Sequence, residues 1–218
     1  MTLTAPHRIP PDEALRRTAV VAVLRAGSGR HLLPVARTLA DAGLVCLELT
    51  LTTPGALETL ATLRKELGDS VDIGMGSVRS GDEARRSLDA GAGFVVSPGF
   101  RPDVVTLATA AGVPSYPGGL TPTELAAAWD AGASAVKLFP ASTVGPAHLA
   151  AFGGPYPDVP VMPTGGIGID DVPAWLRAGA LAVGLGGPLL GDALSGGDLE
   201  ALAHRARRVL GLAAGARS

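Results

Sequence analysis

The chain has 218 residues, long enough to bury a substantial core, and 47% of them are hydrophobic while only 4% are aromatic. Its formal net charge of −2, without a long basic run, gives no electrostatic basis for binding nucleic acid or an anionic membrane. Its apolar stretches are shorter than a membrane span and the N-terminus has no apolar signal segment, so we expect a cytoplasmic protein. The predominance of small aliphatic residues predicts one α/β domain spanning 1–218, with helices packed on a parallel sheet.

A unit of one strand and one helix repeats along the chain. The dipeptide Ala-Gly ends a helix-like stretch just before an apolar run at five places: Ala42-Gly43, Ala90-Gly91, Ala111-Gly112, Ala131-Gly132 and Ala178-Gly179. The intervals between these glycines are one or two steps of roughly 20 to 24 residues, the length of one strand plus one helix. The repeat therefore predicts alternating strands and helices.

Taken in chain order, the expected elements are an N-terminal helix over 11–17, eight strands with helices between them, and a C-terminal helix over 198–212. The strands are expected at 18–25, 45–49, 71–75, 93–97, 113–116, 134–138, 159–163 and 181–185. Eight such units predict a (β/α)₈ TIM barrel with an extra N-terminal helix. The alternative is a doubly wound open sheet, but no Gly-x-Gly-x-x-Gly motif follows the first strand.

Polar or glycine-rich positions stand where most of these strands end. Because the carboxyl ends of barrel strands carry the chemistry of this architecture, these positions are the candidate site residues. They are Arg25, Glu48, Ser77, Pro98, Lys137, the segment Thr164-Gly165-Gly166 and the segment Gly184-Leu185-Gly186-Gly187.

Lys137 stands out because only two of the 18 Lys and Arg residues are lysines. It lies in the apolar segment 133–140, whereas Lys65 lies in a polar stretch that we expect to be a solvated helix face. Burial favours the neutral, nucleophilic form of an amine, which arginine cannot supply. Lys137 is therefore a candidate imine-forming lysine, and the alternative is a strand-end lysine that reaches water or pairs with a carboxylate.

Glu48 lies between two leucines in the second predicted strand. If Cys46, Glu48 and Thr50 share the inward face, the carboxyl group of Glu48 lies in the barrel mouth near Lys137. The functional interpretation is a general acid/base, and the alternative is a structural ion pair. Cys46, the only cysteine, is expected to be a buried structural thiol.

The last two strand ends indicate an anion site. Glycine-rich loops let backbone N–H groups approach a phosphate, and the loops at 164–166 and 184–187 fit that pattern. Arg25, which ends the first strand beside the eighth, could add positive charge, although it could also be a surface arginine. The four histidines are scattered without ligand spacing, so neither a metal nor another cofactor is expected.

A family resemblance is carried by eight motifs that follow one another along nearly the whole chain. They are Val-Ala-Val-Leu-Arg-Ala (21–26), Leu-Glu-Leu-Thr (47–50), Gly-Met-Gly-Ser-Val (74–78), Val-Ser-Pro-Gly (96–99), Tyr-Pro-Gly (116–118), Thr-Pro-Thr-Glu-Leu (121–125), Val-Lys-Leu-Phe-Pro (136–140) and Pro-Thr-Gly-Gly-Ile (163–167). Through them the sequence resembles the 2-keto-3-deoxy-6-phosphogluconate (KDPG) aldolase family, which includes 4-hydroxy-2-oxoglutarate (KHG) aldolases. The resemblance implies a metal-independent class I aldolase on a (β/α)₈ barrel, assembled as a homotrimer.

The same resemblance implies roles for the candidate residues. By position, Lys137 would be the imine-forming lysine and Glu48 the general acid/base. Phe139, in the lysine motif, is a further candidate for contact with the substrate. The phosphate would be held by residues of the two glycine-rich loops, namely Thr164, Gly165, Gly166, Gly186 and Gly187.

At the pyruvate end, the resemblance places Ser77 and Pro98. Hydroxyl groups of Ser77 and of Thr50 or Thr52 would orient the substrate carboxylate. Three positions depart from the family pattern: Thr52 replaces an arginine that often binds the carboxylate, Ser77 replaces a threonine, and Pro188 replaces a serine. Pro188 lacks both a hydroxyl group and a backbone N–H donor, which weakens the predicted phosphate site.

The predicted activity is reversible cleavage of KDPG into pyruvate and glyceraldehyde 3-phosphate by a class I aldolase, a lyase. Cleavage of 4-hydroxy-2-oxoglutarate to pyruvate and glyoxylate is the alternative. A sugar-phosphate epimerase or isomerase that uses Lys137 as a base, or a non-catalytic phosphosugar sensor, could have the same fold. Only the aldolase needs an imine.

Overall fold

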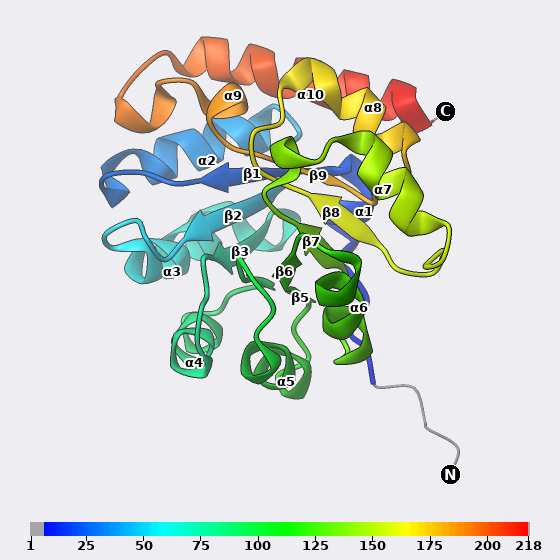
Figure 1. Cartoon of the computed structure of the whole chain (residues 1–218). Helices are drawn as coiled ribbons and strands as arrows, with labels where there is room; N and C mark the ends of the chain where they lie inside the picture. The colour runs from blue at the N-terminus through cyan, green and yellow to red at the C-terminus, as the bar shows by residue number, and fades with distance from the viewer. Residues whose placement is uncertain (1–6, 218) are drawn as a thin grey trace.

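The computed structural model describes residues 7–217 and has an α/β fold, in which helices cover the outer face of parallel strands (Figure 1). The larger sheet has the order β5-β4-β3-β2-β1-β9 and forms a half-barrel. Its strands are β1 (Val20–Leu24), β2 (Cys46–Thr50), β3 (Asp72–Gly76), β4 (Val95–Val96), β5 (Ser115–Tyr116) and β9 (Val183–Leu185). The smaller sheet has the order β6-β7-β8, formed by β6 (Gly118–Gly119), β7 (Val136–Leu138) and β8 (Val161–Pro163).

The helices begin where the sequence supplies capping residues. Thr121 and Glu124 form a capping box at the start of α6 (Pro122–Asp130), and Ser80 accepts a hydrogen bond from the backbone N–H of Glu83 at the start of α4 (Gly81–Asp89). The helices are α1 (Glu13–Thr18), α2 (Leu32–Asp41), α3 (Ala56–Leu67), α4 (Gly81–Asp89), α5 (Pro102–Ala110), α6 (Pro122–Asp130), α7 (Pro146–Gly153), α8 (Val172–Arg177), α9 (Gly187–Leu190) and α10 (Leu199–Arg217). None of these helices is both long and apolar enough to cross a membrane.

Each predicted strand range overlaps a strand, and the alternation with helices agrees with the repeat in the sequence. The fifth predicted range, 113–116, covers only β5, because Pro117, which has no N–H to donate to a neighbouring strand, separates β5 from β6. The two sheets meet at two places. The backbone N–H of Ser134 donates to the Ser115 carbonyl at 3.0 Å, and Thr164 forms an isolated parallel bridge with Gly184.

The strands bury their two faces in different surroundings. The inner face holds a fully buried cluster that includes Cys46, Phe94 and Tyr116, with Leu15 of α1 packed into it. Leu47 and Leu49, which alternate with Cys46 along β2, belong instead to the larger cluster shared with the helices. The alternation of side chains along β2 therefore gives Glu48 the same inward direction as Cys46, as the sequence predicted.

Candidate active site

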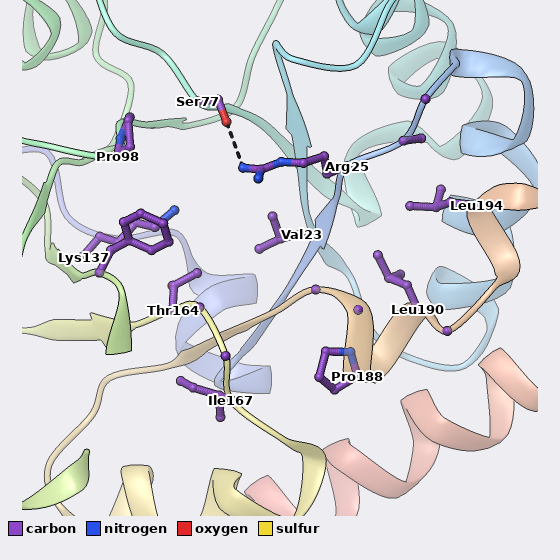
Figure 2. A pocket seen from close by; sticks show the side chains of 18 of the residues that line it. Val23, Arg25, Ser77, Pro98, Lys137, Thr164, Ile167, Pro188, Leu190 and Leu194 are labelled. Carbon is purple, nitrogen blue, oxygen red and sulfur yellow. Dashed lines mark hydrogen bonds between the residues drawn. The ribbon is translucent and has the colours of Figure 1, made fainter. Parts of the chain in front are cut away.

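A cavity of about 370 Å³ opens at the carboxyl ends of the strands (Figure 2). Most of the residues singled out in the sequence line it: Arg25, Ser77, Pro98, Lys137, Phe139, Thr164, Gly165, Gly166, Gly186 and Gly187. They come from loops and strand ends that are far apart in the chain. The parallel arrangement of the strands brings them to one end of the molecule.

Lys137 and Glu48 meet at the base of this cavity. Lys137 lies on β7 and is 6% exposed, and Glu48 lies on β2 and is 1% exposed. The distance from Lys137 Nζ to Glu48 Oε1 is 3.8 Å, and Nζ lies 5.2 Å from the centroid of the Phe139 ring. Glu48 does not line the cavity itself, so its carboxyl group stands behind the lysine. Its second oxygen, Oε2, is buried and has no hydrogen-bond partner among the described residues.

Two glycines of β3 provide the space for these side chains. A Cβ atom at Gly76 would overlap the carboxyl group of Glu48, and one at Gly74 would overlap the ring of Phe94. Because a strand turns every second residue to the same face, the two glycines leave neighbouring gaps on the inner face of the sheet. The segment Gly74-Met-Gly76 is thus explained by the packing of the site as well as by the turn that follows.

The threonines after Glu48 hydrogen-bond to one another and do not line the cavity. Thr50 is fully buried, with its hydroxyl oxygen 3.4 Å from the Leu24 carbonyl, 3.2 Å from the Thr53 hydroxyl and 3.1 Å from that of Thr52. Thr53, which sequence reasoning missed, accepts a hydrogen bond of 3.0 Å from the backbone N–H of Ala26. Its only sequence signal was the run of threonines. The network braces the loop that carries Arg25.

Arg25 and Ser77 lie at the same end of the cavity. The Arg25 side chain points towards Ser77 and away from Pro188 and Leu190, and its Nη2 is 3.5 Å from the Ser77 hydroxyl oxygen (Figure 2). Ser77 has a φ of 61°, in the left-handed region that non-glycine residues rarely adopt. The sequence placed Arg25 beside the eighth strand, but the side chain reaches across towards the third.

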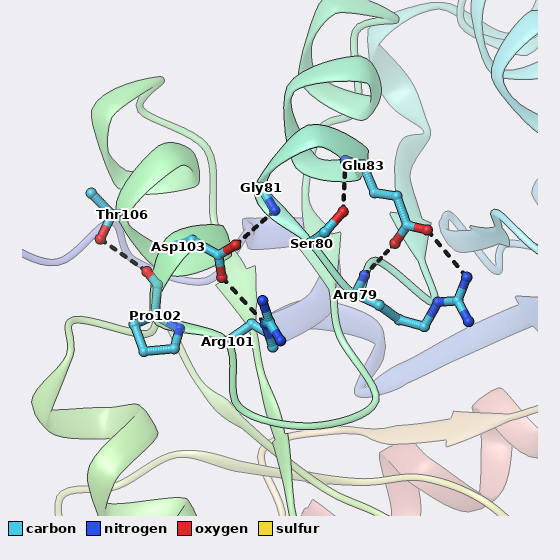
Figure 3. Close-up of polar contacts among 8 residues, drawn as sticks. All are labelled: Arg79, Ser80, Gly81, Glu83, Arg101, Pro102, Asp103 and Thr106. Carbon is cyan, nitrogen blue, oxygen red and sulfur yellow. Dashed lines mark hydrogen bonds and ion pairs between the residues drawn. The ribbon is translucent and has the colours of Figure 1, made fainter.

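A polar network ties together the loops that follow β3 and β4 (Figure 3). Asp103 accepts hydrogen bonds from the backbone N–H of Gly81 at 2.8 Å and from Arg101 Nε at 3.4 Å. The hydrogen bond from the Arg101 side chain, with that from Gly81, holds the pKa of Asp103 below its usual value. The network therefore links the segments that follow Ser77 and Pro98 in the chain.

The far end of the cavity is formed by the loop and short helix after β9. Beyond the expected Gly186 and Gly187, its lining contains Pro188, Leu190, Gly191, Leu194 and Ser195. None of these side chains is charged. Pro188 occupies the first turn of α9, a position where the missing N–H costs no helical hydrogen bond. The residues after Pro188 were missed in the sequence because nothing local shows that this segment folds back over the site.

Other reactive side chains stand apart from the cavity. Cys46 is a free, buried thiol, and burial raises its pKa well above the usual value, as suits a structural cysteine. Among residues 7–217, no group of three or more His, Cys, Asp or Glu side chains is arranged to hold a metal ion.

A buried amine beside a buried carboxylate, at the carboxyl ends of parallel strands, defines an α/β enzyme with a site suited to imine and acid/base chemistry. The chain belongs to the KDPG and KHG aldolase family, whose model matches residues 12–204, and it is therefore an aldolase, a carbon–carbon lyase.

Known proteins similar to the chain agree with this family. A 2-dehydro-3-deoxy-phosphogluconate aldolase of Treponema pallidum is 36% identical over 92% of this chain and 97% of its own. A solved 4-hydroxy-2-oxoglutarate and 2-dehydro-3-deoxyphosphogluconate aldolase is 41% identical, with a TM-score of 0.81 over 92% of this chain and 96% of its own. The KDPG aldolase of Legionella pneumophila, solved with pyruvate captured as a covalent carbinolamine, is 27% identical, with a TM-score of 0.82 over 90% of this chain and 96% of its own.

Proposed function

We propose that this protein reversibly cleaves KDPG into pyruvate and glyceraldehyde 3-phosphate through an imine on Lys137. The observation that carries the proposal is the buried Lys137 amine, which lines the cavity 3.8 Å from Glu48 in a chain of this family. The carbinolamine captured in the Legionella pneumophila relative supports the same covalent chemistry here.

The first half of the reaction forms the imine. The neutral Lys137 amine attacks the ketone carbon of the substrate and gives a carbinolamine, which loses water to become an iminium ion. Glu48 supplies the proton that the departing hydroxyl group needs, acting directly or through a water molecule. Its oxygen Oε1 lies 3.8 Å from the Lys137 amine, where the imine forms.

The second half breaks the carbon–carbon bond. Glu48 takes the proton from the hydroxyl group that becomes the aldehyde, and the electrons of the broken bond move to the iminium, which becomes an enamine. After the aldehyde leaves, the enamine is protonated on carbon to restore the iminium. Water then attacks the iminium carbon, releasing pyruvate and the free lysine.

Arg25 is proposed to bind the carboxylate of pyruvate together with Ser77. Its guanidinium lies next to the Ser77 hydroxyl group and at the same end of the cavity as Pro98 (Figure 2). Since Thr52 stands where an arginine often binds this carboxylate, Arg25 would supply the missing cation. This position favours the carboxylate over the phosphate role that the sequence suggested for Arg25.

The phosphate is proposed to bind at the loops containing Thr164, Gly165, Gly166, Gly186 and Gly187, where backbone N–H groups can approach an anion. KHG cleavage is the second candidate. The observation that favours it is Pro188, which removes a backbone donor from the far end of the cavity, while Leu190 and Leu194 make that end more apolar. An epimerase, an isomerase or a phosphosugar sensor would not need the imine.

At the level of the whole chain, we propose a closed (β/α)₈ barrel formed by a single domain over 1–218. The support is the Thr164–Gly184 bridge between the ends of the two sheets, with the hydrogen bond from Ser134 to Ser115 joining them on the other side. The family resemblance supports a homotrimer. The resemblance also supports catalysis without a metal, and a cytoplasmic location is part of the same proposal.

The decisive experiment is a mass spectrum of peptides from protein treated with pyruvate and borohydride. We expect a reduced pyruvate adduct on Lys137, none on Lys65, and loss of activity in step with the adduct. Lys137→Arg keeps the charge but should give no adduct and no turnover, because a guanidinium is not a usable nucleophile near neutral pH. An unmodified Lys137 peptide would overturn the imine mechanism. We also expect a chelator to leave the wild-type turnover rate unchanged, because the proposed reaction needs no metal.

A further inference from the structure

Arg205 lies on α10, outside the cavity, and holds the loop that forms the cavity's far end. Its Nε donates a hydrogen bond to the Leu189 carbonyl at 2.6 Å, and its Nη2 donates to the Leu190 carbonyl at 3.0 Å. These carbonyls end the short helix α9, where no further turn of helix can donate backbone N–H groups to them. The two contacts therefore replace a helical cap with one bidentate guanidinium.

The loop is built closely around this guanidinium. Gly191, which follows α9 with a φ of 56°, leaves the space for it, because a Cβ atom there would lie 2.8 Å from Arg205 Nη2. Leu190 and Gly191 both line the cavity, as do Gly186 and Gly187 just before them. A shift of Arg205 would thus move the backbone that faces the substrate.

The charge of Arg205 is also left without a carboxylate partner. None of the ion pairs formed within residues 7–217 includes it. The side chains that line the far end of the cavity carry no charge, and Arg25 points towards Ser77 instead. Arg205 is half-buried, and a cation in such surroundings is less screened than one in open solvent.

We propose that Arg205 is a positioning residue that makes the far end of the cavity selective for substrates with a terminal phosphate. Arg205 fixes the loop of Gly186 to Gly191 through the carbonyls of Leu189 and Leu190. Its charge also gives this end of the cavity a positive potential, in place of the backbone N–H donor that Pro188 lacks. The inference rests on the proposed aldolase function, since the phosphate in question belongs to the aldehyde half of KDPG.

The test compares KDPG with its dephosphorylated counterpart, 2-keto-3-deoxygluconate, in the full-length enzyme. We expect Arg205→Met to lower the ratio of their kcat/KM values about tenfold or more, chiefly through a higher KM for KDPG. Arg205→Lys, which keeps the charge but not the paired donors, should retain part of the ratio. The rate of pyruvate trapping on Lys137 should be unchanged in both variants, because pyruvate does not reach the far end.

Arg207→Met is the matched control, since Arg207 is an exposed arginine on the same helix. It should leave the ratio unchanged. The role of Arg205 is overturned if the ratio of the two kcat/KM values stays at the wild-type value in Arg205→Lys and Arg205→Met. An equal fall of kcat/KM for both substrates is one such outcome. Failure of the wild-type enzyme to trap pyruvate would instead reject the aldolase mechanism on which the inference rests. Inhibition by inorganic phosphate gives a second readout and should weaken in Arg205→Met but not in Arg207→Met.

Discussion

Gly76 shows how the site depends on a single missing methyl group. Its position on β3 faces the Glu48 carboxyl group, and any Cβ atom there would overlap it. Gly76→Ala should therefore push the carboxyl group away from Lys137 and lower turnover as Glu48→Gln would, by roughly 10²–10⁴-fold. Steady-state kinetics measure the loss, and circular dichroism shows whether the variant is folded.

Gly74→Ala is the comparison for this prediction, because Gly74 lies on the same face of β3 and its added methyl group would meet Phe94 instead. It should lower thermal stability, and the folded fraction should keep more of its turnover than Gly76→Ala does. A folded Gly76→Ala variant with wild-type turnover would show that turnover does not depend on the present position of the Glu48 carboxyl group.

Arg25 separates two interpretations of the same residue. If it binds the carboxylate, Arg25→Ala should lower kcat/KM about tenfold or more for KDPG and for 2-keto-3-deoxygluconate alike, since a charge-assisted hydrogen bond is lost in both. Pyruvate trapping should slow as well. Arg79→Ala, which removes an exposed arginine of the loop after β3 that pairs with Glu83 of α4, should leave both substrates unaffected. A loss confined to KDPG would instead support the phosphate role suggested by the sequence.

At the scale of an element, strand β3 begins with a carboxyl group in unfavourable surroundings. Asp72 borders a cavity of about 280 Å³ with Asp12 and Arg64, at the end of the strands opposite the active site. Burial, with a smaller effect of Asp12, raises the pKa of Asp72 from 3.8 to about 7, although Arg64 opposes the shift. Near neutral pH the folded protein therefore binds a proton that the unfolded chain releases.

The sign of the pH dependence follows from that difference. A raised pKa in the folded state stabilises the protein fully below the unfolded value of 3.8, and this contribution is lost as the pH rises through about 7. Asp72→Asn removes the ionisation, so we expect a higher melting temperature than wild type at pH 8 and a smaller difference at pH 5. Thermal melts across this range measure the effect, and a variant that is less stable at pH 8 would contradict it.

At the scale of the whole molecule, the proposed homotrimer predicts the mass of the particle in solution. Light scattering on the purified protein should give the mass of three copies of the 21.8 kDa chain. Closed cyclic symmetry limits the assembly to one size, so the mass should not grow with concentration. A monomeric mass across the concentrations used for kinetics would reject the trimer without affecting the chemistry proposed for Lys137 and Glu48.

The local sequence determined the order of the elements and most of the residues around the cavity. Alternation along β2 gave Glu48 the direction of Cys46, the repeated Ala-Gly units marked the helix ends, and the apolar run around Lys137 marked the amine. These features depend on near neighbours in the chain, so a periodic pattern is enough to find them. Pro117, which separates β5 from β6, is also a local signal in the sequence, but the range predicted for the fifth strand ended at residue 116.

Only the tertiary structure decided which side chains meet across the cavity. It turned Arg25 towards Ser77, kept Thr50 out of the cavity lining and brought Arg205 from the last helix against the carbonyls of α9. It also placed the half-buried Asp72 near Asp12. Contacts of this kind join residues that are distant in the chain, and their energies vary steeply with distance and burial. A pattern of residues along one strand or helix does not give the distances between residues on different elements. The sequence therefore predicted where the strands end, but not which side chains contact one another across the cavity.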